Sequence, residues 1–235
     1  MIRILKYYIK DMPRMKSALY YFTNLSLVLM LISCLGISHD NEEVVWFISD
    51  LLQSKEGVLV HGNPKIIESP YGNAVQFDGI DDALFLDEMP LKGLSEFTIE
   101  MIIRFDKGGN EEQRYFHAGT VKKDRSLIEM RSSNDSWYLD GMFESNDKWV
   151  VLMSPDFSHP LDEWHHIAFT VKNGKQATFV NGNKELEGHV EYAPITEGKT
   201  SIGVRQNKVS WFKGAIYSIK ITNKVLNPED FKTIK

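Results

Sequence analysis

The sequence predicts an all-β fold built from antiparallel strands. From His166 to Val171, large apolar residues alternate with polar or small ones, which is the period-2 pattern of a half-buried strand. Asn173-Gly174 and Asn181-Gly182, eight residues apart, each supply the two left-handed positions of a tight hairpin turn. These local signals predict a three-stranded antiparallel meander over residues 162 to 188.

Further strands are predicted over residues 113–118, 126–132, 137–144 and 201–205, where alternation divides the side chains between a core face and a polar face. The residues predicted to face the core are Phe116, Ala118, Ile128, Met130, Trp137, Leu139, Phe143, Ile202 and Val204. The opposite face is predicted to carry Gln113, Tyr115, His117, Leu127, Glu129, Arg131, Tyr138, Asp140, Glu144 and Arg205. Because the side-chain period of a strand is two, a slip of one residue would invert these assignments.

The N-terminal 33 residues have the pattern of an export signal. Lysines and an arginine precede a short apolar run, Leu25–Ile32, which is too short to span a bilayer. Cys34 is the only cysteine of the chain, so the exported domain has no internal disulfide. We expect a signal peptide over residues 1–33, an acidic tether over residues 34–45 and one folded domain over residues 46–235.

Leu31-Ile32-Ser33-Cys34 resembles a bacterial lipobox. The resemblance implies that Cys34 is lipidated and anchors the protein to a membrane of the cell envelope, with the outer membrane, and its surface, as the expected location. The alternative is a cleaved signal followed by an unlipidated cysteine. Residues 35–43 resemble the acidic export tags of surface lipoproteins, although a solvated linker explains the same charges.

The folded part resembles the laminin G-like domains of the concanavalin A-like lectin and glucanase superfamily. The resemblance rests on four segments: Trp164–Ala168, Phe179–Gly182, Ala74–Asp82 and Gly214–Ile221. It covers residues 46 to 235 and implies an antiparallel β-sandwich of the jelly-roll type. It is specific for the fold and weak for function, because this fold carries lectins, hydrolases, lyases and adhesion modules.

The polar face is the candidate ligand-binding site, because aromatic rings cover the apolar face of a sugar and polar groups bind its hydroxyls. The predicted binding residues are Tyr115, Glu129, Arg131, Tyr138, Asp140 and Arg205. Arginine adds a planar fork that suits carboxylate or sulfate groups. We therefore expect a glycan-binding surface lipoprotein whose partner is an acidic, uronic-acid-containing polysaccharide or oligosaccharide.

An eliminating enzyme, a lyase or dehydratase acting on uronic acids, is the alternative, and a structural or protein-binding module is the third hypothesis. Elimination needs a base, an acid and a cation, roles that His117, Tyr138 and Arg131 could fill. A glycoside hydrolase of the superfamily's Glu-x-Asp-x-x-Glu type is not expected, because that triplet is absent from the sequence.

The sequence predicts no cofactor, no metal and no nucleic acid partner. The formal net charge is −5, and the chain has no basic cluster of the kind that binds nucleic acid. The acidic segment Asp78–Asp82 offers oxygen ligands to calcium, but Tyr217 occupies the position where relatives place an acidic partner, so we expect a turn without metal. His165 and His166 are adjacent strand residues that point to opposite faces, which favours structural roles for both.

Overall fold

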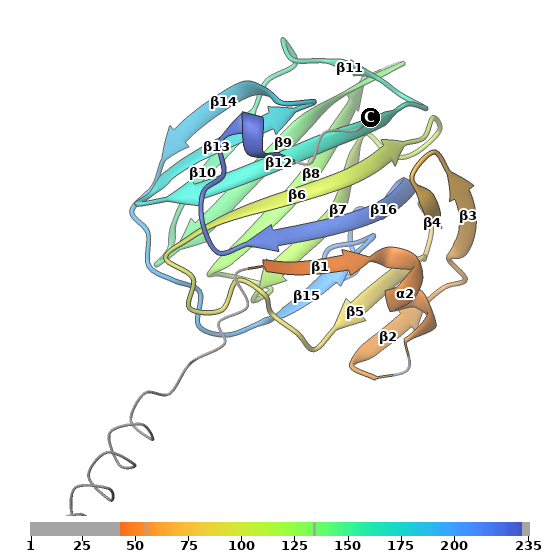
Figure 1. Cartoon of the computed structure of the whole chain (residues 1–235), viewed down its shortest axis with the longest axis horizontal. Coiled ribbons are helices and arrows are strands. Elements are labelled where there is room, and N and C mark those ends of the chain that lie inside the picture. The colour runs from red at the N-terminus through yellow and green to blue at the C-terminus, as the bar shows by residue number, and fades with distance from the viewer. Residues whose placement is uncertain (1–42, 55, 134, 232–235) are drawn as a thin grey trace, which may run out of the picture. The chain divides into compact units, whose positions relative to one another are not determined.

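The computed structural model describes residues 43–231 except residues 55 and 134, and these residues form two antiparallel sheets packed face to face (Figure 1). Each sheet has eight strands. In spatial order, sheet A contains β14 (Asn183–His189), β13 (Lys175–Val180), β12 (Trp164–Lys172), β6 (Glu96–Phe105), β16 (Lys213–Thr222), β4 (Gly72–Asp78) and β3 (Lys65–Ser69), with β1 (Glu43–Phe47) paired to β16.

Sheet B lies behind sheet A in the view of Figure 1. Its strands, in spatial order, are β10 (Lys148–Met153), β9 (Ser136–Ser145), β8 (Arg125–Ser133), β7 (Glu112–Gly119), β15 (Lys199–Ile202), β5 (Ala83–Leu86) and β2 (Val58–His61), with β11 (His159–Pro160) paired to β9. One short helix, α2 (Ile48–Gln53), follows β1, and a single 3-10 turn, η1 (Pro228–Asp230), lies near the end of the described chain. The prediction of an all-β antiparallel sandwich is confirmed.

The predicted meander is present as β12, β13 and β14. Asn173 and Gly174 have φ of 50° and 78°, and Asn181 and Gly182 have φ of 49° and 80°. Left-handed values at both central residues give the turn a twist that matches the flanking strands. The hairpins therefore form where the two Asn-Gly pairs predict them.

Aromatic side chains fill the centre of the space between the sheets. Phe105 of sheet A packs against Trp137 of sheet B with 4.1 Å between ring centroids, and Tyr115 lies 5.3 Å from the same Phe105 ring. The side chains that alternation assigned to the core on β8 and β9 are all buried: Ile128, Met130, Trp137, Leu139 and Phe143. Since each large buried side chain contributes about 1.5–3 kcal/mol, this interior dominates the stability of the fold.

A β-bulge in β7 changes the face on which two predicted residues lie. The register with β8 shifts between Arg114 and Phe116, so that Tyr115 is the extra residue and lies fully buried among core aromatics. The placement of Tyr115 on the polar face is therefore wrong, and Arg114 takes that side instead. Gln113 is also misplaced, because it pairs with core-facing Met130 and is buried. A bulge inverts the alternation of the residues that precede it.

The start of the domain also differs from the predicted boundary. Strand β1 begins at Glu43 and pairs with β16 from Glu43↔Thr222 to Phe47↔Ser218, so residues 43–45 belong to the sandwich and not to a tether. Trp46 is buried and Val44 packs against the core, which explains why the strand starts this early. Cys34 and the predicted export signal lie outside the described residues. No helix among residues 43–231 is long and apolar enough to cross a membrane.

Gly174→Val should destabilise the domain more than Gly182→Val. Both substitutions force a β-branched residue into the left-handed region, at a cost of about 1–3 kcal/mol. At Gly174 the added Cβ would also meet the Val190 carbonyl oxygen and, at 2.8 Å, the His189 ring, whereas nothing lies within 4 Å at Gly182. Urea unfolding of both purified variants measures the difference, and equal losses of unfolding free energy would contradict this account of the first hairpin.

Candidate functional site

The outer face of sheet B carries a closely spaced network of charged side chains. Strand pairing places Arg114, Glu129 and Asp140 opposite one another on β7, β8 and β9. The neighbouring row contains Glu112, Arg131 and Tyr138. The predicted residues Glu129, Arg131, Tyr138 and Asp140 therefore lie together on one face, as alternation predicts.

Arg131 is fully engaged by carboxylates of this network. Its guanidinium donates from Nε to Asp140 Oδ2 at 2.9 Å, and its Nη2 lies 2.7 Å from the same oxygen and 3.6 Å from Glu129 Oε2. Its Nη1 pairs with Glu112. Since three carboxylates surround the guanidinium, Arg131 presents no free fork to a ligand carboxylate.

Arg114, which the bulge places on this face, closes the network from the other side. Its Nε donates to Glu129 Oε1 at 2.6 Å, its Nη1 donates to Ser210 Oγ at 2.7 Å, and its Nη2 pairs with Glu112. Burial raises the pKa of Glu129, and Arg114 opposes that rise. Burial likewise raises the pKa of Asp140, against the hydrogen bond and charge of Arg131. Charges that are buried and paired in this way hold strands β7, β8 and β9 together.

His117 lies on the same face but is completely buried. Its Nε2–H donates to the Thr120 carbonyl oxygen at 2.9 Å, and its Nδ1 accepts from the Gln206 backbone N–H at 3.3 Å. Burial lowers the pKa of His117 to about 4, with Arg205 and Arg125 acting in the same direction. The imidazole is therefore a neutral group with both nitrogens occupied.

The three side chains considered for elimination do not converge on one point. His117 pairs with Leu127, whereas Tyr138 pairs with Arg131, four residues further along β8. Four residues of strand correspond to about 13 Å. A base and an acid must both reach the reacting group through short hydrogen bonds, so this arrangement does not support the enzymatic alternative.

Arg205 lies apart from the carboxylate network, next to the loop after β7. Its Nη2 donates to the Val121 carbonyl oxygen at 3.0 Å. Burial lowers the pKa of Arg205, and the charges of Arg125 and Arg114 lower it further. The carboxylates of Glu129 and Glu144 act on the pKa of Arg205 in the opposite direction.

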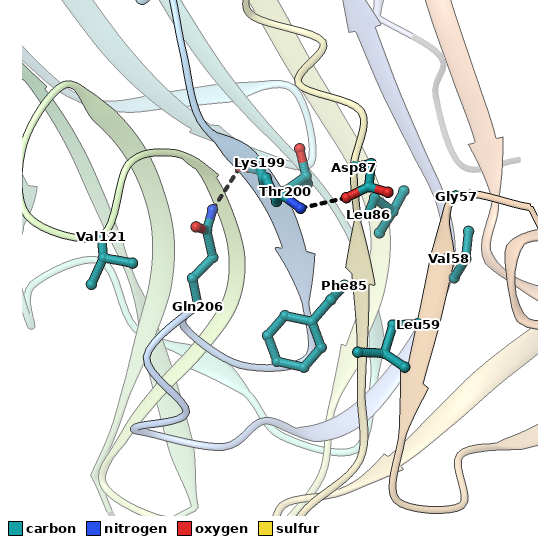
Figure 2. Close-up of a pocket in the computed structure, with 10 residues that line it drawn as sticks. All are labelled: Gly57, Val58, Leu59, Phe85, Leu86, Asp87, Val121, Lys199, Thr200 and Gln206. Carbon is teal, nitrogen blue, oxygen red and sulfur yellow. Dashed lines mark hydrogen bonds and ion pairs between the residues drawn. The ribbon is translucent and has the colours of Figure 1, made fainter.

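A shallow depression opens near Arg205, between β2, β5, β15 and two loops (Figure 2). Its volume is about 430 Å³. Its lining residues are Gly57, Val58, Leu59, Phe85, Leu86, Asp87, Val121, Lys199, Thr200 and Gln206. We call this hollow the Phe85 depression, because the Phe85 ring lies between Leu59 and the Gln206 side chain in Figure 2.

Strand pairing explains the apolar floor. Leu84 and Leu86 face the core, so Phe85 between them points outward, opposite Leu59 on β2 and Ser201 on β15. Leu59 is 67% exposed, so an apolar side chain adjoins the Phe85 ring at the surface. The outward direction of Phe85 could not be predicted from the sequence. All four residues of the segment Ala83-Leu84-Phe85-Leu86 are apolar, so no alternation of polar and apolar residues shows which side chain faces outward.

Polar and cationic groups surround the apolar floor. The Gln206 amide nitrogen donates to the Lys199 carbonyl oxygen at 2.6 Å, and the Lys199 ammonium lies 2.5 Å from Asp87 Oδ1. The Lys208 ammonium lies 5.8 Å from the Phe85 ring centroid. Within the described chain Lys208 has no carboxylate partner. The depression thus combines apolar contact area with fixed polar groups and one uncompensated cation.

The remaining sequence candidates serve the fold. Asp78 Oδ1 accepts hydrogen bonds from the backbone N–H groups of residues 80–82. Partial burial acts to raise the pKa of Asp78, but these hydrogen bonds outweigh it and the pKa is lowered. Asp82 accepts from the backbone of Asn63 at 2.6 Å, so the acidic segment stabilises its own turn. His165 packs on Trp137 inside the sandwich, and His166 lies on the outer face 3.1 Å from Glu100.

Comparison with known proteins agrees with this architecture. The model of a laminin G family, described as the concanavalin A-like lectin/glucanases superfamily, matches residues 78–231. Among curated proteins none matches the chain. The three solved structures described next are less than 25% identical to this chain, so they indicate the fold alone.

Domain 4 of AbnA, a GH43 extracellular arabinanase from Geobacillus stearothermophilus solved with arabinotriose, is 19% identical with a TM-score of 0.54, over 72% of this chain and 79% of that chain. The heptameric SAP-like pentraxin from Limulus polyphemus is 18% identical with a TM-score of 0.51, over 73% and 78%. The binding domain of botulinum neurotoxin DC in complex with SialylT is 14% identical with a TM-score of 0.54, over 74% of this chain but only 44% of that one. Since the family model matches more than half of the 235 residues, the chain belongs to the concanavalin A-like lectin/glucanases superfamily as a protein with a laminin G-like domain.

Proposed function

We propose that this domain binds oligosaccharides, and that the Phe85 depression is the binding site. The observation that carries the proposal is the combination of an outward aromatic ring, a 67% exposed leucine and fixed amide and ammonium groups in one hollow. A sugar ring has an apolar C–H face and a rim of hydroxyls, and this arrangement matches both. Two neighbours of the same fold, solved with arabinotriose and with SialylT, support a sugar as the ligand.

The proposed ligand is an acidic sugar, and the cation that selects it is Lys208 rather than Arg131. Arg131 is neutralised by three carboxylates, whereas the Lys208 ammonium lies over Phe85 without one. Lys122 and Lys123 are exposed in the loop that carries Val121, so further cationic side chains border the depression and favour a positive potential there. A uronic or sialic carboxylate complements such a potential.

The loop that carries Lys208 is held in place by backbone hydrogen bonds. Gly203 N donates to Tyr115 O at 3.0 Å, Arg114 N donates to Ser210 O at 2.9 Å, and Lys208 N donates to Arg205 O at 2.7 Å. A loop whose backbone is already ordered loses less freedom when a ligand binds, which favours affinity. The bulge that buries Tyr115 thus also supports the site.

The proposal includes an envelope location with a lipid on Cys34. Support comes from the lipobox-like Leu31–Cys34 and from the basic and apolar segments that precede it. A lipid anchor would hold a glycan-binding domain at the membrane, which suits capture of polysaccharide during carbohydrate utilisation.

Phe85→Ala should weaken binding of acidic oligosaccharides at least about tenfold, or about 1.4 kcal/mol, because it removes the floor of the site. Lys208→Gln should weaken acidic ligands by a similar factor, reduce the salt dependence of binding and leave neutral ligands unaffected. Calorimetry with a uronic acid trimer, a sialylated trisaccharide and a neutral trisaccharide measures these effects.

The matched control is Trp149→Ala, which removes a 63% exposed ring from the same outer face at β10, away from the depression. Loss of affinity in this control, with none in Phe85→Ala, would move the site to β10. Absence of binding to every sugar would favour a protein-interaction module. Appearance of unsaturated uronic products during the titration would restore the eliminating enzyme.

Arg131→Ala should destabilise the domain by about 3 kcal/mol, because it leaves the buried Asp140 carboxylate without its cation, whereas Glu129 keeps Arg114. Lys184→Ala removes an exposed ion pair with Glu187 and should cost less than about 1 kcal/mol. Chemical denaturation of both variants makes the comparison. An Arg131→Ala variant that keeps the parental stability but no longer binds acidic sugar would show that the arginine contacts ligand after all.

Cys34→Ala should abolish labelling of the protein by a fatty-acid analogue in expressing cells and should release it from the membrane fraction. The physical reason is that the thiol is the atom that would carry the lipid. Membrane attachment that is unchanged in this variant would show that the chain is held by another segment.

A further inference from the structure

A second cluster of aromatic side chains lies on the outer face of sheet A, on the opposite side of the sandwich from the Phe85 depression. Phe47 contacts Tyr217 with ring centroids 5.5 Å apart, Tyr217 contacts Tyr71 at 5.8 Å, and Tyr71 contacts Trp164 at 5.8 Å. The four rings come from β1, β16, the turn between β3 and β4, and the start of β12. Figure 1 shows β1, β16, β4 and β3 within one sheet. We call these four residues the outer aromatic array.

Tyr217 joins the array because of a second β-bulge. The register between β16 and β6 shifts from Ile216↔Ile103 to Ser218↔Ile102, so that Tyr217 is the extra residue. Ile216 before it and Ile219 after it are completely buried in the core, and Tyr217 points outward between them. Bulges re-aim side chains in this way and are common beside binding sites.

A pre-ordered polar group lies beside the array. The Arg104 guanidinium lies 5.5 Å from the centre of the Trp164 ring, and its Nε donates to Asp106 Oδ1 at 2.7 Å. Its Nη2 donates to Gln76 Oε1 at 2.9 Å, and Gln76 Nε2 in turn donates to Asp106 Oδ2 at 2.7 Å. The hydrogen bond to Asp106 raises the pKa of Arg104, against the effect of burial. The group is rigid and has no net charge.

The polar tips of the array have no protein partner within the described chain. No hydrogen bond to a described residue is made by the hydroxyls of Tyr71 and Tyr217 or by the indole N–H of Trp164. The same is true of Arg104 Nη1, since the hydrogen bonds of that guanidinium come from Nε and Nη2. Tyrosine hydroxyls both donate and accept, whereas indole and guanidinium only donate. Apolar ring faces and unused hydrogen-bonding tips therefore occur together at this surface.

We propose that the outer aromatic array is a second carbohydrate-binding surface, specific for uncharged oligosaccharides. Neighbouring rings of the array meet edge-on or tilted, at interplanar angles of 64°, 46° and 78°, so they offer sugar C–H groups a series of inclined apolar surfaces. The tyrosine hydroxyls match sugar hydroxyls as both donors and acceptors. A proline-rich peptide offers mainly carbonyl acceptors, so it would use the tyrosine hydroxyls only as donors, whereas a sugar hydroxyl can use both of their functions. The Arg104–Asp106 pair is neutral, which distinguishes this surface from the cationic Phe85 depression.

The two surfaces lie on opposite sheets and can be occupied at the same time. A polysaccharide that carries both neutral and acidic segments could then engage one domain twice or be cross-linked by several domains. Two linked contacts raise the effective affinity without any new interaction. This second surface does not depend on the Phe85 depression, and either can exist without the other.

Calorimetry with neutral hexasaccharides from arabinan, xylan and β-glucan, and with a proline-rich decapeptide, tests the proposal. Tyr71→Ala should weaken the hexasaccharide that binds at least about tenfold, and Phe47→Ala, at the other end of the array, at least about threefold. Tyr71→Phe, which keeps the ring, should lose less than Tyr71→Ala. Phe157→Ala is the control, because Phe157 is 38% exposed, close to the 41% of Phe47, but lies outside the array.

Each outcome decides the proposal. If no neutral hexasaccharide binds, or if Tyr71→Ala and Phe47→Ala bind like the parent, the array is not a sugar site. Binding of the decapeptide, lost in the same variants, would replace the sugar with a peptide. Phe85→Ala separates the two surfaces. If this variant loses only the acidic ligand, both proposed sites are supported. If the neutral ligand is lost in Phe85→Ala but not in Tyr71→Ala, the array is not a sugar site and the proposal for the Phe85 depression stands. If Tyr71→Ala lowers the melting temperature, its loss of binding could reflect unfolding, and the binding of Phe47→Ala and Tyr71→Phe then decides whether the array is a sugar site.

Discussion

The aromatic packing between the two sheets is the interaction on which the rest of the structure depends. Phe105 and Trp137 approach within 4.1 Å across the sandwich, and Tyr115 and Phe212 pack beside them. A core of large rings is close-packed only if every contributing strand points the correct residue inward. The bulge in β7 satisfies this condition, because it turns Tyr115 into the core and thereby places Arg114 outside.

That exchange determines the chemistry of the outer face of sheet B. Once Arg114 lies outside, it can pair with Glu129, while Arg131 pairs with Asp140. Buried carboxylates are costly unless each is matched by a cation and hydrogen bonds, and here they are matched. The consequence is that both guanidiniums of this network are engaged by carboxylates. In the proposed function, ligands are recognised outside this network, at regions that combine outward-facing aromatic rings with polar groups.

Two such regions occur, one on each sheet, and they differ in charge. The Phe85 depression has the Lys208 ammonium 5.8 Å from the centre of the Phe85 ring. The outer aromatic array is balanced by the Arg104–Asp106 pair. The two proposed sites would together suit a polysaccharide of mixed composition. They lie on opposite sheets of the sandwich, so one site would not block the other.

The sequence by itself determined the features that depend on neighbours in the chain. The two Asn-Gly pairs specify the hairpins, and alternation along β8 and β9 assigned Ile128 and Trp137 to the core, because the side-chain period of a regular strand is two. Tertiary structure alone decided the rest. A bulge is invisible in a single strand, so Tyr115 was placed on the wrong face. Whether Arg131 is free or saturated, and whether Phe85 lines a depression, depends on strands and loops far apart in sequence, and only their packing brings those groups together.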